Sequence, residues 1–330
     1  MANSSSKPGS PALPSADPRG KTRTVCVAWF AVFLMAFALY AATANRGAQW
    51  QDSGYHILRI VTKEPVNPLG LALSHPLHHW LGRVAVSLHL FEPCFAITLV
   101  SAFGAAIAAA NTLACVFTLT RRWPAAVFAA MSLAFAHTFW QMATLTETYT
   151  LAAALLSGEC WCLIVYARTR RPIYLWAMLL LNGLGISNHP LALLTVPILA
   201  VVILYAIRLN HLPIHHVAVG AALWLLGASL YGVMVVQEWA RSGDAWATIG
   251  SALFGHGYRD DVLNLRMSGD HAARSAAYLA MNFPNLLLPI AVYGLVRSVQ
   301  RGLFPLARRI VSTTGLSRPT LVSWWIIATA

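Results

Sequence analysis

Long runs of apolar residues, separated by short arginine-bearing turns, dominate this 330-residue chain. An α-helix needs about 20 such residues to cross a bilayer. The chain is 58% hydrophobic and only 10% charged, whereas a soluble domain carries about a quarter charged residues. We therefore predict an all-α, polytopic helical membrane protein.

The runs predict about eight to nine transmembrane helices. The first is expected to be an uncleaved anchor, because its apolar core is longer than that of a signal peptide. The ninth begins near Pro319 and reaches Ala330 after about half a span, so we expect a truncated C-terminus. The complete spans are predicted at about residues 24–44, 94–119, 124–143, 146–166, 172–188, 190–207, 213–236 and 273–297.

The charges predict one orientation for these spans. Basic residues in short loops mark the cytoplasmic side, and all of the 11 acidic residues except Asp17 and Glu159 fall on the opposite side. Residues 1–23 are expected to be a disordered cytoplasmic tail, and residues 24–330 to be one transmembrane domain in a bacterial inner membrane or the ER membrane. Since the net charge of +12 consists mainly of orientation signals, we expect a lipid bilayer and no nucleic acid as partner.

Two predicted outer loops are long, residues 45–93 and 237–272. The first contains the amphipathic stretch Trp80–Phe91, which predicts one or two interfacial helices. Four polar clusters fall on this outer side. They are residues 50–55, His75-Pro76, residues 140–149 and residues 183–189. Polar clusters from separate spans that meet at one membrane depth indicate a functional site.

Asp52 is the predicted catalytic residue, because a transferase that activates an acceptor hydroxyl needs a carboxylate base. A leaving lipid phosphate needs cations or hydrogen-bond donors, and aromatic rings can stack on a sugar. The predicted donor- and acceptor-binding residues are Trp50, Arg59, His75, Trp140, Glu147, Tyr149, Asn188 and His189. Alternative interpretations remain open: Asp52 as a helix cap, the tryptophans as interfacial anchors, Glu147 as a first-turn charge, and Asn188-His189 as a helix break.

Five short motifs follow one another along residues 45–260. They are Asp52-Ser53-Gly54, His75-Pro76, Phe139-Trp140, Glu147-Thr148-Tyr149-Thr150-Leu151, and Gly183-Leu184 with Asn188-His189. This order resembles that of the polytopic protein O-mannosyltransferases of the transmembrane-protein-260 type and their bacterial relatives, in the glycosyltransferase C superfamily. The resemblance implies transfer of a sugar, expected to be mannose, from a polyprenyl- or dolichyl-phosphate donor to a protein or glycan acceptor on the extracytoplasmic face. It implies no metal and no cofactor.

The chain departs from the family pattern at three places. Tyr55 replaces a glutamate, Leu77-His78-His79-Trp80 replaces Pro-Gly-Tyr-Pro, and Gly250–Tyr258 lacks a tryptophan. A divergent or non-catalytic member of a glycosylation complex is therefore one alternative.

Two further alternatives belong to other classes of protein. A transporter or lipid flippase usually has polar residues at mid-membrane and inverted repeats, whereas only Glu159 is predicted to lie deep and no repeat is visible. A di-iron oxygenase is suggested by the histidines of residues 75–79 and 211–216. The predicted topology places these two groups on opposite sides, and each contains a proline that disrupts the helix.

Overall fold

The computed structural model describes residues 18–209, 212–256, 260, 269–282 and 287–298. These residues contain helices and no strands, which confirms the all-α prediction. The elements are α1 Pro18–Thr43, α2 Gln51–Thr62, η1 Leu71–Leu73, α3 Pro76–Ser87, α4 Pro93–Thr120, α5 Trp123–Ala134, α6 His137–Thr144, α7 Tyr149–Thr169, α8 Pro172–Asn188, η2 Pro190–Thr195, α9 Val196–Arg208, α10 Ile214–Ser242, α11 Ala245–Phe254, α13 Gly269–Asn282 and α14 Leu287–Ser298. The η elements are 3₁₀ helices.

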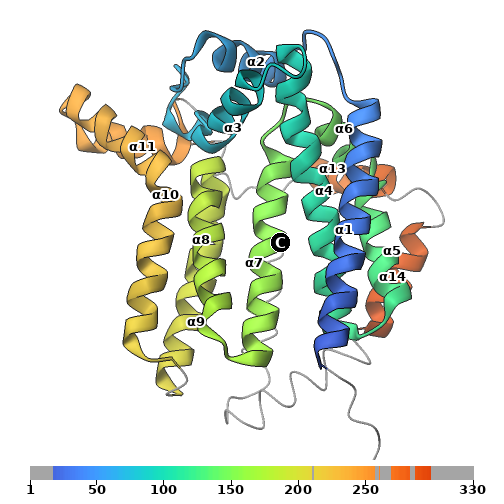
Figure 1. Cartoon of the computed structure of the whole chain (residues 1–330). Helices are drawn as coiled ribbons and strands as arrows, with labels where there is room; N and C mark the ends of the chain where they lie inside the picture. Colours follow the sequence, from blue (N-terminus) through green and yellow to red (C-terminus); the bar gives the residue numbers. More distant parts are fainter. Residues whose placement is uncertain (1–17, 210–211, 257–259, 261–268, 283–286, 299–330) are drawn as a thin grey trace, which may run out of the picture.

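Within these ranges, five helical segments are long and apolar enough to cross a membrane, namely Thr24–Thr43, Pro93–Thr120, Tyr149–Thr169, Pro190–Arg208 and Ile214–Ser242. The number becomes six if α5 and α6, which are bent by 60° at their junction, form one broken span. Helix α8 has 17 residues and packs beside α7 and α10 (Figure 1).

Three predicted boundaries differ from the structure or lie outside the described residues. Helix α1 begins at Pro18, so residues 18–23 of the predicted tail are helical. The predicted span 273–297 corresponds to two separate helices, α13 and α14. The predicted ninth span, from Pro319, lies outside the described residues.

Helix α4 forms the centre of one half of the bundle. Its alanines are fully buried against α1, α5 and α7, as at Ala105, Ala106 and Ala109. A Cβ placed at Gly104 would lie 2.8 Å from the backbone nitrogen of Leu151, so α4 and α7 approach more closely than a larger residue allows. Small residues at helix crossings permit such close packing in membranes.

A glycine contact also joins α8 to α10 in the other half. A Cβ at Gly227 would lie 2.7 Å from the carbonyl oxygen of Leu180, and one at Gly183 would clash with the carbonyl oxygen of Trp224. The Ser187 hydroxyl donates a hydrogen bond to the Gly227 carbonyl over 2.8 Å. The C-terminal part of α8 is thereby fixed against α10.

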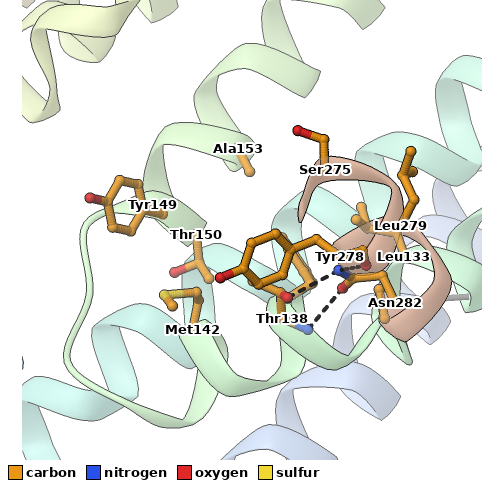
Figure 2. A pocket seen from close by; sticks show the side chains of 12 residues that line it. Leu133, Thr138, Met142, Tyr149, Thr150, Ala153, Ser275, Tyr278, Leu279 and Asn282 are labelled. Atoms are coloured by element: carbon orange, nitrogen blue, oxygen red, sulfur yellow. Dashed lines mark hydrogen bonds between the residues drawn. The ribbon is translucent and has the colours of Figure 1, made fainter. Parts of the chain in front are cut away.

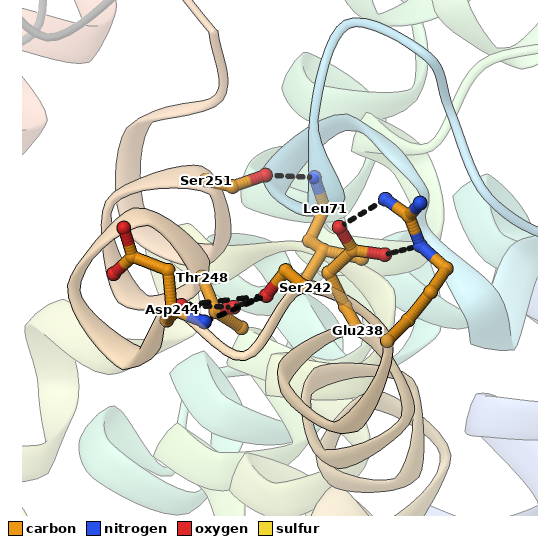
Figure 3. A network of polar contacts seen from close by, with 7 residues as sticks. Leu71, Glu238, Ser242, Asp244, Thr248 and Ser251 are labelled. Atoms are coloured by element: carbon orange, nitrogen blue, oxygen red, sulfur yellow. Dashed lines mark hydrogen bonds and ion pairs between the residues drawn. The ribbon is translucent and has the colours of Figure 1, made fainter.

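Helices α2 and α3 lie across one end of the bundle, at the top of Figure 1. Helix α11 packs beside them on η1, where the Ser251 hydroxyl accepts a hydrogen bond from the Leu71 N–H over 3.0 Å (Figure 3). The His256 N–H donates to the Leu69 carbonyl over 2.7 Å. Figure 3 also shows Glu238, at the end of α10, where it pairs with Arg241 at 2.7 Å. The two long predicted outer loops therefore contact each other.

The arginine-bearing turns lie at the opposite end of the bundle. Residues 121–122 join α4 to α5, and residues 170–171 join α7 to α8. Helix α10 also starts at that end, with Ile214 as its first residue and His215 and His216 directly after it. The histidines at the start of α3 and those at the start of α10 are therefore separated by the length of the bundle and cannot share a metal ion.

Candidate functional site

The turn between α6 and α7 holds Glu147 in a fixed position. The Ser101 hydroxyl of α4 lies 2.9 Å from both the N–H and the carbonyl oxygen of Glu147, and it accepts from the former and donates to the latter. The Thr150 hydroxyl donates to the Ser101 carbonyl over 2.9 Å. Because the N–H and the carbonyl of Glu147 are both bonded to one α4 side chain, the backbone that carries this carboxylate is fixed against α4.

Glu147 is buried and bonded to the first turn of α2. The Ser53 hydroxyl donates to its Oε1 over 2.5 Å. Burial raises the pKa of Glu147, the Ser53 hydrogen bond lowers it, and the nearby Asp52 carboxylate raises it again. Asp52 is exposed and lies within α2, whose N-cap is Trp50 without a side-chain bond. The interpretation of Asp52 as a helix cap is therefore wrong.

Gly54 explains how α2 reaches this position. A Cβ at residue 54 would clash with the carbonyl oxygen of Gln49, so only glycine fits here. The Gln49 side chain in turn accepts from the Thr146 N–H over 2.8 Å and donates to the Thr98 hydroxyl over 2.9 Å. The chain before α2 is thus tied to the same turn that carries Glu147.

Four imidazole rings form a second group beside the carboxylates. His56 of α2 lies 5.4 Å from His75 and 5.5 Å from His78, measured between ring centroids. His189 lies 4.9 Å from His75. The Tyr149 ring, 5.7 Å from His189, connects this group to the Glu147 turn. A row of polar side chains therefore runs from Asp52 and Glu147 to the histidines, across α2, α3, α7 and the end of α8.

Backbone contacts hold this row together. The Nδ1–H of His75 donates to the Asn188 carbonyl over 2.8 Å. The Asn188 side chain donates to the Thr148 carbonyl over 3.0 Å. His75 itself has a left-handed backbone, φ 50°, at the N-cap of α3, a conformation that is uncommon for a residue with a side chain. The predicted helix break at Asn188-His189 is confirmed, because α8 ends at Asn188. The Asn188 carbonyl accepts its hydrogen bond from His75.

The imidazoles are neutral at neutral pH because they are buried. Burial, assisted by the Arg59 charge, lowers the pKa of His56 to about 4. Burial also lowers the pKa values of His75 and His78 well below the ordinary range, with His56 as the next contributor for both. A neutral imidazole carries one N–H donor and one acceptor. The N–H of neutral His75 is bonded to the Asn188 carbonyl, so its Nε2 is an acceptor, whereas the N–H of neutral His189 is on Nε2 and can donate to a phosphate.

Arg59 is fully buried, and its guanidinium binds backbone carbonyls. It donates to the carbonyls of Pro65, Leu73 and Ser74, the last over 3.1 Å. The Tyr55 ring covers it, with 5.9 Å between the guanidinium carbon and the ring centroid. In this arrangement Arg59 folds the loop between α2 and α3. Its predicted role in donor binding stays a prediction.

The predicted aromatic residues occupy three different environments. Tyr149 is half exposed and lies at the site. Trp140 packs edge-to-face on Tyr40 at 5.6 Å and stacks on Phe135 at 5.7 Å. Trp50 is 91% exposed. The structure thus brings Tyr149 to the polar row, whereas Trp140 makes packing contacts and Trp50 projects outward.

An apolar cavity of about 720 Å³ opens beside Tyr149 (Figure 2). Its walls come from α5, α6, α7 and α13, and they include Phe139, Met142 and Tyr278. Asn282 of α13 closes one side, where its side chain accepts from the Thr138 N–H over 2.8 Å and donates to the Thr138 hydroxyl over 3.0 Å. A long apolar group could therefore lie next to the polar row.

Sequence reasoning missed His56 and the bond between Ser53 and Glu147. The signal for His56 was its position three residues after Ser53, since residues three apart share a helix face. No group of three metal-ligating side chains with suitable geometry occurs within the described ranges.

Long apolar helices with carboxylates and imidazoles gathered at one end define an integral membrane protein with a polar site at the ends of its helices. Residues 72–212 of the chain match the family model described as the protein O-mannosyl-transferase TMEM260 N-terminal domain. This similarity supports the transmembrane-protein-260 type and a glycosyltransferase role. The matched range includes His75, Glu147 and His189, whereas Asp52 precedes it. No curated protein and no solved structure matches the chain.

Proposed function

We propose that this protein is a membrane glycosyltransferase that moves a sugar, mannose by family similarity, from a polyprenyl- or dolichyl-phosphate donor to a hydroxyl of a protein or glycan acceptor. The observation that carries the proposal is the continuous row from Asp52 and Glu147 through Tyr149 to His189 and His75, beside an apolar cavity. This row offers a base at one end and hydrogen-bond donors for a phosphate at the other.

Asp52 is the proposed general base. It is exposed, so an acceptor can reach it, and it lies beside the buried Glu147. In the proposed step, Asp52 takes the proton of the acceptor hydroxyl while the acceptor oxygen attacks the anomeric carbon. The bond between that carbon and the phosphate oxygen breaks, and the lipid phosphate leaves with the electron pair. A base placed within reach of the acceptor typically contributes 10²–10⁴-fold in rate.

The histidine end of the row is the proposed phosphate site. Neutral His189 can donate from Nε2, because its Nδ1 accepts from the Leu191 N–H, whereas neutral His75 has its only N–H bonded to Asn188 and could donate from Nε2 only after protonation. His56 lies next to His75. The negative charge of the leaving phosphate would favour protonation of these rings, because an adjacent opposite charge raises the pKa of histidine. The cavity beside Tyr149 is the proposed place for the first part of the prenyl chain, since its lining is mostly apolar.

The proposed location of the site is the extracytoplasmic face, with the N-terminus in the cytoplasm. The arginine-bearing turns lie at the end of the bundle opposite the site, which agrees with the orientation that the charges predict.

Tyr55 bears on the non-catalytic alternative. Its ring lies against the Arg59 guanidinium and not in the row of carboxylates. A glutamate at this position would stand four residues before Arg59 on the same helix face, where it would form an ion pair. The departure from the family pattern thus alters the support of Arg59 and leaves Asp52 and Glu147 in place.

The test uses purified protein in liposomes that contain a polyprenyl-phosphate sugar. Asp52→Asn should lower transfer at least about 100-fold, while the folded fraction stays unchanged. Glu92→Gln is the matched control, because Glu92 is also an exposed acid of the outer segment and makes no side-chain cap bond. Equal transfer by the Asp52→Asn variant and the wild type would remove Asp52 as the base.

A further inference from the structure

Glu159 carries a carboxyl group deep inside the bundle, far from the polar row. It lies midway along α7 and is only 4% exposed. Acidic side chains in the interior of membrane spans are costly and need partners. Glu159 takes no part in the chemistry proposed above, so its buried position calls for another explanation.

The hydrogen-bond partners of Glu159 come from two other elements, and a third element is bonded to one of them. The Asn182 side chain of α8 donates to Glu159 Oε2 over 3.2 Å, and the Thr195 hydroxyl of η2 lies 3.2 Å from the same oxygen. Asn182 Nδ2 also lies 2.7 Å from the Thr195 hydroxyl, and Asn182 Oδ1 accepts from the Trp224 indole of α10 over 2.8 Å. One carboxyl oxygen therefore connects α7 to α8 and to η2, with α10 bonded behind them.

The network holds η2 against the last turns of α8. Asn182 Nδ2 lies 3.1 Å from the Ala192 carbonyl in the middle of η2. A Cβ at Gly185 would lie 2.9 Å from the Ala192 side chain, so the glycine permits this close approach. By contrast, Leu191 and Leu194 on the other face of η2 are 56% and 71% exposed. Within the described residues, η2 is thus held mainly from the side that faces Glu159.

His189 is the residue between α8 and η2. Its Nδ1 accepts from the Leu191 N–H of η2 over 3.2 Å, and its carbonyl accepts from the Ala192 N–H over 3.1 Å. Its ring faces His75 and Tyr149. A shift of η2 would therefore move this ring out of the row.

We propose that Glu159 is a positioning residue, which fixes η2 through Asn182 and Thr195 and so places His189 in the site. The inference rests on the proposed function for the meaning of His189, but the position of η2 can be measured without any transfer reaction. The needed chemistry is a hydrogen-bond acceptor at Oε2, which glutamine supplies and leucine does not.

The experiment measures hydrogen–deuterium exchange of the 189–195 backbone in lipid nanodiscs, together with sugar transfer. Glu159→Leu should accelerate exchange in this segment about tenfold and lower transfer by a similar factor, because Asn182 and Thr195 lose the acceptor that joins them to α7. Glu159→Gln should leave both within about twofold of the wild type, since its carbonyl oxygen accepts both bonds. Gly185→Ala should also accelerate exchange, because its added Cβ would lie 2.9 Å from the Ala192 side chain and would displace η2 while keeping the Glu159 carboxylate.

Ser157→Ala is the matched control, because Ser157 is a polar α7 residue bonded to Asn111 of α4 and not to η2. It should leave exchange at residues 189–195 unchanged. Unchanged exchange in both Glu159→Leu and Gly185→Ala would overturn the proposal, as would equal acceleration in Glu159→Gln and Glu159→Leu. Faster exchange in Glu159→Leu, with full transfer in both that variant and His189→Ala, would support the positioning of η2 and refute the role of His189 in the reaction.

Discussion

The Ser53 hydroxyl donates to Glu147 Oε1 over 2.5 Å, and this contact joins residues 94 positions apart in the sequence. It ties α2, from the segment between α1 and α4, to the turn that precedes α7. Ser101 of α4 binds the backbone of the same turn. The exposed Asp52, next to Ser53, therefore has a defined position relative to Glu147. Two acids held in this way differ in burial, since Asp52 is exposed and Glu147 is buried.

Ser53→Ala should raise the pKa of Glu147 further. Burial and Asp52 already raise it, and the Ser53 hydrogen bond opposes them. A folded-state pKa above the unfolded value means that the native protein binds more protons, so the free energy of unfolding falls as pH rises through that window. We expect the variant to lose about 1–3 kcal/mol, with the loss concentrated above pH 4.5. Urea unfolding at several pH values measures it. Ser87→Ala, which removes a hydroxyl bonded only within α3, should have no such pH dependence.

Acid should destabilise the protein through its buried histidines. The pKa of His56 is lowered from 6.5 to about 4, so the unfolded chain binds more protons than the native protein between these values. The contribution of His56 to the free energy of unfolding is fully present above pH 6.5. It is lost as pH falls toward 4, which lowers the free energy of unfolding by about 3 kcal/mol. His75 and His78 add losses of the same sign. His56→Gln should weaken the fall of Tm on acidification, whereas the exposed His89→Asn should not change it. An equal fall of Tm in all three proteins would contradict the burial argument.

Gly54→Ala should displace the start of α2. The added Cβ would collide with the Gln49 carbonyl oxygen, which is backbone and cannot rotate away. We expect a cost of about 1–3 kcal/mol, typical of overpacking, and loss of transfer because Ser53 moves from Glu147. Gly47→Ala is the control, since its nearest neighbour would be 3.9 Å away. Thermal unfolding and transfer assays on both variants check the prediction, which fails if the two behave alike.

Ala153→Phe should fill part of the cavity beside Tyr149. Ala153 lines that cavity on α7, so a larger ring would compete with the prenyl chain of the donor. We expect the KM for a long-chain donor to rise about tenfold, equivalent to ~1.4 kcal/mol, with little change in kcat. A donor with a short chain should be much less affected. Leu156→Phe, at an exposed position of the same helix, is the control. A similar KM for the long-chain donor in both variants would argue against this cavity as the lipid site.

Most of the helices could be predicted because a membrane span needs a long apolar run and leaves a clear signal. The ends of α1, α4 and α7 lie close to the predicted ones except at Pro18. The bend between α5 and α6 was missed, since both arms are apolar and hydropathy carries no information on backbone direction. For the same reason, one predicted span covers both α13 and α14.

The sequence predicted which groups of residues form the candidate site, but not the individual contacts between them. Asp52, His75, Glu147 and His189 were expected at the same end of the bundle, and the structure brings their segments together. The binding of Arg59 to carbonyls of its own loop could not be predicted, because backbone groups leave no mark in a sequence. His56 was overlooked because it belongs to none of the motifs, although it shares a helix face with Ser53.

The hydrogen bond from His75 to the Asn188 carbonyl has a consequence for biosynthesis. The end of α8 emerges from the ribosome more than 100 residues after His75, yet its last carbonyl needs the earlier imidazole as donor. The segment that carries His75 must therefore wait until the later helices arrive. Insertion of individual spans does not complete the protein, and a chain interrupted before residue 188 would leave this donor without its acceptor.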